Sequence, residues 1–215
     1  NFEKVRHKVP MLSLGNAFNE EDLKNFEKKI FNFLSLNKIS VVDYSAEPKI
    51  DGISASLIYI NGKFIKGLSR GDGAEGEDIT ENLKTIKDIP QNVNTKNFPN
   101  EIDIRGEVFI ENDDFKKISE KFANPRNAAS GSLRQKDYNV TAMIPLRFIA
   151  YTFGYTSEMK INNQTEFLEN LKVWGFKTNP FNKKISGIKN LMSNHKNLEE
   201  KRKEIAFDID GVVYK

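Results

Sequence analysis

The 215-residue sequence contains no cysteine and no long hydrophobic run. The absence of cysteine excludes disulfides and cysteine-ligated zinc within this stretch, and it is typical of a reducing compartment, so we expect a cytoplasmic protein. No hydrophobic run approaches the ~20 residues that a membrane-spanning helix needs. The polar, basic first ten residues also lack the hydrophobic segment of a signal peptide. We therefore expect no membrane partner.

The chain has little charge imbalance, with a net charge of +3 at neutral pH. This value is compatible with a polyanionic partner but does not indicate one by itself. Hydrophobic residues make up 38% of the chain, which is enough for one substantial core. The sequence begins without methionine and stops at Lys215 inside an apparent strand, so we interpret it as part of a longer protein.

Hydrophobic periodicity predicts a mixture of helices and strands. Residues 20–36 have apolar residues at helical spacing and follow Asn19, a suitable N-cap. Asn61-Gly62, the strongest short hairpin signal, joins predicted strands at 53–60 and 63–70. Other strands are predicted at 101–110, 145–156 and 206–215, other helices at 78–86, 113–122, 165–176 and within 187–205, and loops at 70–80 and 122–137, the second with room for one helical turn. Hairpin-joined strands with interspersed helices indicate an α+β fold with antiparallel sheets.

The stretch EPKIDG places Lys49 between two carboxylates, Glu47 and Asp51. If this stretch is extended, the three side chains point to one side. A free lysine has a pKa of about 10.4, and an enzyme that uses lysine as a nucleophile must lower it by burial, nearby cations or a metal. Carboxylates act in the opposite direction, so we expect these two to hold the ammonium, accept hydrogen bonds from substrate or bind a divalent cation. The alternative is the solvated face of an edge strand.

Five further segments accompany KIDG: SRGDGAEGEDIT, DIRGEVF, FANPRNAASGSLRQ, FIAYTFG and FDIDGVVYK. Together they resemble the nucleotidyltransferase core of bacterial NAD-dependent DNA ligases, from Val9 to Lys215. The resemblance implies an α+β nucleotidyltransferase fold of antiparallel sheets with flanking helices and a nucleotide site between them. It also implies that residues 1–215 are a truncated adenylation domain, without the NMN-binding N-terminal domain and the downstream OB, zinc, helix-hairpin-helix and BRCT regions.

The resemblance implies a three-step reaction. Lys49 attacks the α-phosphate of NAD, expels NMN and holds AMP as a phosphoramidate; AMP passes to the 5′-phosphate of a DNA nick, and the 3′-hydroxyl seals the strand. The implied cofactors are NAD and Mg²⁺ (or Mn²⁺), with zinc only in the absent downstream region. The implied partner is nicked double-stranded DNA. The implied enzyme is a monomer that acts in DNA replication and repair. Because nothing in this chain binds the nicotinamide half of NAD, we expect the fragment alone to be inactive with NAD.

The same resemblance assigns the site residues. Lys49 is the nucleophile, and Asp51 and Asp210 are the acidic catalytic residues. The cofactor-binding residues are Ser13, Leu14, Glu47 on the adenine side, Arg70 and Glu107 at the ribose and phosphates, Tyr151 stacked on adenine, and Lys215. The expected phosphate contacts are Arg126, Arg134 and Arg202. The metal ligands are left open, with Asp51, Glu107 and Asp210 as candidates.

Two other classes of protein would share some of these features. One is a non-catalytic nucleic-acid-binding module with the same fold, and the other is an ATP-using relative. The acidic loop GDGAEGED does not decide between them, because it lacks the P-loop pattern and its carboxylates would repel phosphate. We expect that loop to have a structural or switch function.

Overall fold

The computed structural model describes residues 2–37 and 41–215. In this part of the chain the strands form three sheets, all antiparallel. The largest contains, in order, β4 (Lys63–Ser69), β3 (Ile53–Ile60), β6 (Glu101–Phe109) and β7 (Arg147–Thr156). The second contains β8 (Lys183–Ser186), β2 (Asp43–Ile50) and β9 (Ile209–Tyr214), and the third contains β1 (Lys4–Arg6) and β5 (Glu75–Glu77).

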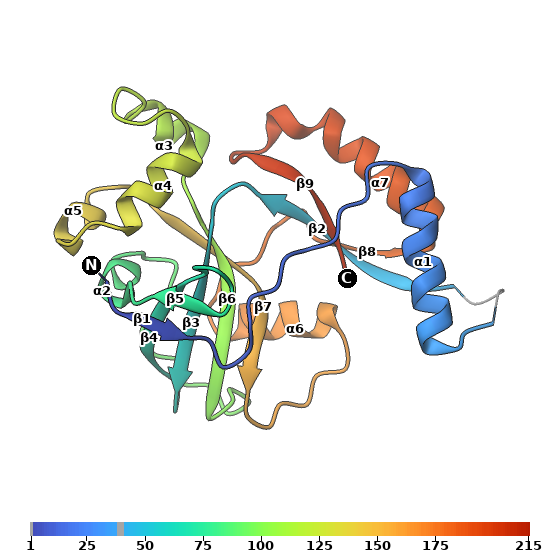
Figure 1. Cartoon of the computed structure of the whole chain (residues 1–215), viewed down its shortest axis with the longest axis horizontal. Coiled ribbons are helices and arrows are strands. Elements are labelled where there is room, and N and C mark those ends of the chain that lie inside the picture. The colour runs from blue at the N-terminus through green and yellow to red at the C-terminus, as the bar shows by residue number, and fades with distance from the viewer. Residues whose placement is uncertain (1, 38–40) are drawn as a thin grey trace.

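The helices lie around the outside of the two larger sheets (Figure 1). They are α1 (Glu20–Leu34), α2 (Thr80–Lys84), α3 (Asn112–Lys116), α4 (Pro125–Leu133), α5 (Tyr138–Ala142), α6 (Gln164–Val173) and α7 (Ile188–Glu200), with a short 3₁₀ helix at Arg202–Glu204. Within the described residues, none of these helices combines the length and the apolar character that crossing a membrane requires. The arrangement confirms the predicted α+β class with antiparallel sheets and flanking helices.

The main core lies on one face of the four-stranded sheet. Ala55, Leu57 and Tyr59 of β3 are fully buried there, because alternate residues of a strand point to the same face. Helices α2, α4 and α6 contribute further buried residues to this core. The opposite face of β3 carries Ser54 and Ser56, so the sheet presents polar side chains on the side away from the core.

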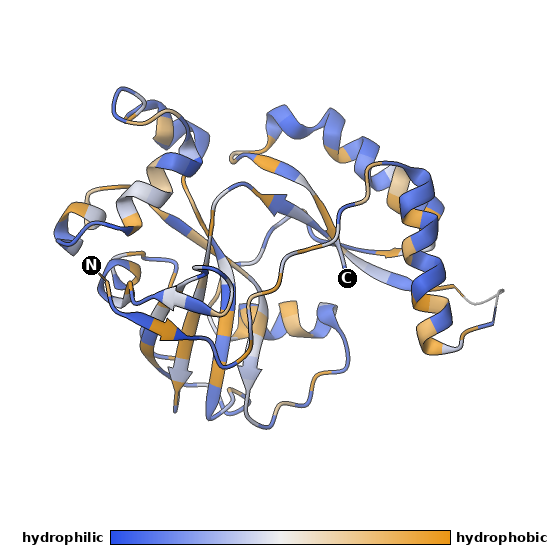
Figure 2. Ribbon diagram, viewed as in Figure 1, coloured by the Kyte–Doolittle hydropathy of each residue, from blue (hydrophilic) through white to orange (hydrophobic). Residues whose placement is uncertain are grey.

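The predicted hairpin between β3 and β4 is confirmed. Asn61 and Gly62 both have positive φ angles, 50° and 73°, as the tightest hairpin turn requires. A Cβ atom at Gly62 would lie 2.2 Å from the carbonyl oxygen of Val93, so only glycine fits. The predicted helix after Asn19 is confirmed as well, since the Asn19 side chain accepts a hydrogen bond from the backbone N–H of Asp22. Figure 2 shows that the last turn of α1 is hydrophobic, and Phe33 there is 88% exposed.

The segment 122–137, predicted as a loop, instead contains α4. Its polar composition obscured two local signals for a helix: Asn124 accepts a hydrogen bond from the N–H of Asn127 at 2.7 Å, and Pro125 occupies the first helical position. Burial of Ala128, Ala129 and Leu133 then holds the helix on the sheet. The predicted loop at 70–80 contains one short strand that the sequence does not predict, β5, whereas α2 falls within the helix predicted at 78–86.

Candidate active site

A cleft of about 930 Å³ lies between the four-stranded and three-stranded sheets. Both sheets contribute to its walls, and so does the segment that connects β1 to α1. Ten of the thirteen site residues expected from the sequence line it: Ser13, Leu14, Glu47, Lys49, Arg70, Glu107, Arg126, Arg134, Tyr151 and Lys215. The structure therefore brings together residues that are as far apart in the sequence as Ser13 and Lys215.

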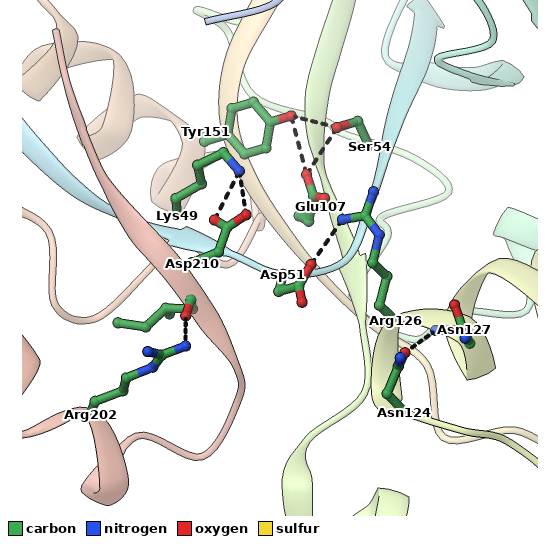
Figure 3. Close-up of polar contacts among 11 residues, drawn as sticks. Lys49, Asp51, Ser54, Glu107, Asn124, Arg126, Asn127, Tyr151, Arg202 and Asp210 are labelled. Carbon is green, nitrogen blue, oxygen red and sulfur yellow. Dashed lines mark hydrogen bonds and ion pairs between the residues drawn. The ribbon is translucent and has the colours of Figure 1, made fainter. Parts of the chain in front are cut away.

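Lys49 lies near the end of β2, beside an irregularity in the pairing between β2 and β9. Its Nζ atom donates to both carboxylate oxygens of Asp210 on β9, at 2.8 and 2.7 Å (Figure 3). The side chains of both residues are partly exposed, at 44% and 43%. Three residues further along, Gly52 is packed so tightly that a Cβ atom there would lie 2.3 Å from the carbonyl oxygen of Val108. The glycine of KIDG thus lets the chain turn directly against β6.

The expectation that Glu47, Lys49 and Asp51 share one side is wrong for Asp51. Strand β2 ends at Ile50, so the alternation does not continue, and Asp51 does not line the cleft. Its carboxylate instead accepts a hydrogen bond from the guanidinium of Arg126 at 2.9 Å (Figure 3). This ion pair ties the turn between β2 and β3 to helix α4.

A buried acid lies in the wall of the cleft opposite Lys49. Glu107 of β6 is only 9% exposed and accepts hydrogen bonds from the hydroxyls of Ser54, at 3.1 Å, and Tyr151, at 3.4 Å. Burial raises the pKa of Glu107 to about 7, although Ser54, Arg126 and Lys49 oppose this effect. Burial together with the charge of Glu107 also raises the pKa of Tyr151. Burial thus favours the neutral form of the Glu107 carboxyl.

A second buried acid connects the two sheets at the inner end of the cleft. Glu47 is 4% exposed and accepts hydrogen bonds from Ser45 Oγ at 2.9 Å, Gln164 Nε2 at 2.8 Å and Lys215 Nζ at 2.8 Å. Lys215 also donates to the backbone carbonyl of Tyr151 at 2.9 Å, and its Nζ lies 5.3 Å from the centre of the Tyr151 ring. Burial lowers the pKa of Lys215, whereas Glu47 acts in the opposite direction.

The remaining lining residues surround the outer part of the cleft. Arg134, at the end of α4, donates two parallel hydrogen bonds to Glu77 of β5, at 3.0 and 2.9 Å. Arg70 donates from Nε to the carbonyl oxygen of Met11 at 3.4 Å. Ser13 and Leu14 belong to the segment between β1 and α1, where both are exposed.

Two expectations about the site residues are not met by the structure, one for Arg202 and one for the candidate metal ligands. Arg202 does not line the cleft, and its guanidinium donates to the carbonyl oxygen of Ile209 at 2.7 Å (Figure 3). The metal-ligand candidates also have separate partners: Asp51 binds Arg126, Asp210 binds Lys49, and Glu107 binds two hydroxyls. Across residues 2–37 and 41–215, no group of three or more histidine, aspartate or glutamate side chains could hold a metal ion. These carboxylates therefore do not fit a preformed metal site.

Sequence reasoning missed three polar residues of this site, Ser45, Ser54 and Gln164. The alternation of β3 gave a signal for Ser54, because Ile53, Ala55 and Leu57 occupy the other face and leave the serine toward the acids of β6. Gln164 begins α6 and bridges Glu47 and the carbonyl of Tyr151, at 2.8 and 2.7 Å. No local pattern could have indicated Gln164, since only the fold brings α6 to this position.

Comparison with known proteins places the whole chain in one family. The family model described as NAD-dependent DNA ligase adenylation domain matches residues 1–215. A DNA ligase of Pelagibacter ubique is 79% identical over 215 residues, covering all of this chain and 32% of that protein. A DNA ligase of Parvibaculum lavamentivorans is 48% identical over 222 residues, covering all of this chain and 31% of that protein. The chain thus spans about a third of the length of these relatives. It belongs to the family of NAD-dependent DNA ligase adenylation domains.

Proposed function

We propose that this chain is the adenylation unit of an NAD-dependent DNA ligase, with Lys49 as the nucleophile. The observation that supports this most directly is the position of Lys49. Its amine lies at a cleft that also contains an aromatic ring, two buried acids and several cations. These are the groups that phosphoryl transfer to a lysine requires.

In the proposed first step, Lys49 Nζ forms a bond to the α-phosphorus of NAD, and the bond from that phosphorus to the NMN oxygen breaks with its electron pair. The ammonium gives up two protons in total, one before the attack and one as the phosphoramidate forms. Asp210 would hold the amine in place, as its contact with Nζ suggests. Arg70 and Arg126 line the same cleft, where their charges attract the phosphates and oppose the charged form of a neighbouring amine.

The other residues have proposed binding functions. The Tyr151 ring would stack on adenine, Glu47 and Lys215 would lie on its polar side, and Glu107 and Arg70 would contact the ribose and phosphates. Ser13 and Leu14 would cover the nucleotide, and Arg126 and Arg134 would bind phosphates of cofactor or DNA. Through its bond to the Ile209 carbonyl, Arg202 would orient the strand that carries Asp210.

In the later steps AMP moves from Lys49 to the 5′-phosphate of a nick, and the 3′-hydroxyl then displaces AMP and seals the strand. We expect this activity in the cytoplasm, in replication and repair. Magnesium is bound through one or two carboxylates together with substrate phosphates in many nucleotide enzymes. The carboxylates of residues 2–37 and 41–215 form no metal site of their own. The proposed steps therefore do not include a metal ion.

The test uses the full-length protein and NAD radiolabelled in its AMP phosphate. We expect covalent label on the wild type and none on Lys49→Ala, while Lys63→Ala, at an exposed position on β4, keeps the label. Adding nicked DNA to the labelled wild type should release the label as AMP while the nick is sealed. Label that persists in Lys49→Ala would refute the assignment of the nucleophile. Labelling by ATP and not by NAD would instead indicate an ATP-using relative.

A further inference from the structure

The segment between β1 and α1 forms one wall of the cleft, although little of it belongs to a regular element. We call residues 3–16 the N-terminal strap. In Figure 1 the strap crosses in front of the four-stranded sheet on its way from β1 to α1. Residues Met11–Leu14 and Asn16 of the strap line the cleft. Within the described part of the chain, no hydrogen bond holds Leu12–Ala17, so the position of this stretch depends on anchors that precede it.

The anchor on the sheet side is a buried ion pair. Arg105 of β6 is 7% exposed, and its Nε and one terminal nitrogen donate to Asp103 at 3.1 and 2.8 Å. The same guanidinium donates to the backbone carbonyl of Pro10, at 3.1 Å, and to that of Val9. One planar cation therefore binds a carboxylate on one edge and two carbonyls of the strap on another, which a lysine could not do.

The neighbouring strands are shaped to hold this pair. Asp103 receives a further hydrogen bond from Ser56 of β3, just as Glu107 receives one from Ser54. On β7, Gly154 leaves the necessary space, because a Cβ atom there would lie 2.2 Å from Asp103 Oδ2 and 2.3 Å from a terminal nitrogen of Arg105. Asp103, Arg105 and Glu107 alternate along one face of β6, so the strap anchor and the buried acid of the cleft share one strand.

The second anchor is the acidic glycine-rich loop at 70–78. Its backbone pairs with the strap along β1 and β5, and the carbonyls of Ala74 and Gly73 accept hydrogen bonds from His7 and Met11, at 2.9 and 2.8 Å. Gly73 has a φ of +96°, and a Cβ atom there would lie 2.8 Å from the carbonyl oxygen of Met11. The carbonyls and backbone of the loop thus hold the strap backbone in place.

We propose that Asp103 and Arg105 are positioning residues for the nucleotide site. Together with the 70–78 loop they fix the strap at Val9–Met11, and this determines where Leu12, Ser13 and Leu14 lie in the cleft. The inference rests on the proposed function, because it takes the cleft to be the nucleotide site. Neither residue touches the nucleotide; they act through the strap.

The test compares Arg105→Lys with Arg147→Lys in the full-length protein. Arg105→Lys keeps the charge beside Asp103 but removes the forked contact with the strap. Arg147→Lys is the matched control: Arg147 lies on the neighbouring strand β7, is paired with the buried Asp88 at 2.7 Å, and contacts neither the strap nor the cleft. Gly73→Ala perturbs the second anchor independently, and remains informative if Arg105→Lys does not fold.

We expect Arg105→Lys and Gly73→Ala to weaken AMP binding and raise KM for NAD by about tenfold, with a smaller change in kcat, whereas Arg147→Lys leaves both near wild type. Amide hydrogen exchange at His7 and Met11, whose N–H groups are hydrogen-bonded to the 70–78 loop, should accelerate in the two strap variants while exchange in β3 and β6 stays slow. Wild-type exchange in the strap together with wild-type AMP affinity would overturn the proposal. If the wild type itself binds no AMP, the proposed function fails, and the exchange data still decide whether these residues anchor the strap.

Discussion

At the scale of single residues, two acids of the site, Asp210 and Glu107, lie in different environments. Asp210 is partly exposed and paired with Lys49, whereas Glu107 is buried and accepts hydrogen bonds from two neutral hydroxyls. Desolvation therefore dominates at Glu107 and favours the neutral carboxyl. The charged form becomes favourable when a polar ligand or a cation enters the cleft, so the protonation of Glu107 is coupled to what the cleft contains.

This environment predicts a pH-dependent effect of Glu107→Gln. The pKa of Glu107 rises from its ordinary value of 4.5 to about 7 on folding. Its pKa is thus higher in the folded state than in the unfolded state. The contribution of Glu107 to the free energy of unfolding is therefore complete below pH ~4.5 and is lost as the pH rises through about 7. Glu107→Gln, which cannot ionise, should be more stable than the wild type at pH 8, by up to about 3 kcal/mol.

Urea unfolding at pH 4.5 and pH 8 measures this difference. The two proteins should have nearly equal stability at the lower pH. Glu199→Gln, which removes an exposed carboxylate on α7, serves as the control and should show no such divergence. A constant difference between Glu107→Gln and wild type at both pH values would mean that burial does not govern this carboxyl.

At the residue scale, sequence reasoning identified most of the cleft because family motifs mark individual positions. Lys49, Glu107 and Tyr151 come from three different strands, and their spacing in the sequence does not reveal that they meet. Gln164 and Ser45 complete the partners of Glu47 but belong to no motif, so only the folded chain shows them. The prediction that Asp51 shares a side with Glu47 and Lys49 was wrong because the sequence does not show where β2 ends.

At the scale of secondary structure, α4 controls the orientation of two cations. Arg126 is in its first turn, and Arg134 is its C-cap. Each is held by a carboxylate from another element, Asp51 and Glu77 respectively. The helix also packs on the core through Ala128 and Leu133, so its position is fixed relative to the sheet.

The N-cap of α4 gives a second prediction. Asn124→Ala removes the hydrogen bond to the N–H of Asn127 and should cost about 1 kcal/mol of stability. Because Arg126 lies in the turn that this cap holds, binding of the full-length protein to nicked DNA should weaken as well. Unfolding curves and fluorescence titration of nicked duplex measure the two effects.

Asn163→Ala on α6 is the matched control, since Asn163 caps its helix in the same way, accepting from the N–H of Glu166 at 3.0 Å. It should lower stability by a similar amount and leave DNA affinity unchanged. Equal loss of DNA affinity in both variants would show that α4 has no special function in DNA binding.

Helices and strands were predictable where the sequence signal for them lies within the element itself. The β3–β4 hairpin and helices α1 and α6 carry their own turn residues, caps and periodicity. Strands β1, β5 and β8 have three or four residues each and are defined only by their distant partners. Short strands of this kind cannot be inferred from propensity, because the pairing itself makes them strands.

At the scale of the whole molecule, the cleft lies where the four-stranded and three-stranded sheets meet. Contacts across it run from Glu47 and Lys215 on the three-stranded sheet to the backbone of Tyr151, directly or through Gln164. A nucleotide placed between the sheets would add further contacts to both. The family resemblance predicted this arrangement, whereas composition and periodicity alone predicted only antiparallel sheets.

Nucleotide binding should therefore stabilise both sheets together. At AMP concentrations a hundredfold above its Kd, the free energy of unfolding should rise by about 2.7 kcal/mol. Amide exchange should slow in β2 and β9 as well as in β7. Tyr151→Phe keeps the ring and should retain the effect, whereas Tyr151→Leu should lose most of it. Protection confined to one sheet would contradict a site between the two.

The central position of β2 has a consequence for how the protein is made. The strand that carries Lys49 lies between β8 and β9, which are synthesised more than a hundred residues later. The pairs Lys49–Asp210 and Glu47–Lys215 span 161 and 168 positions of the sequence. Chains emerge from the ribosome at about 5–20 residues per second, so β2 waits for several seconds with both edges unpaired. During synthesis, the strand that carries Lys49 is thus among the last to have both of its edges paired.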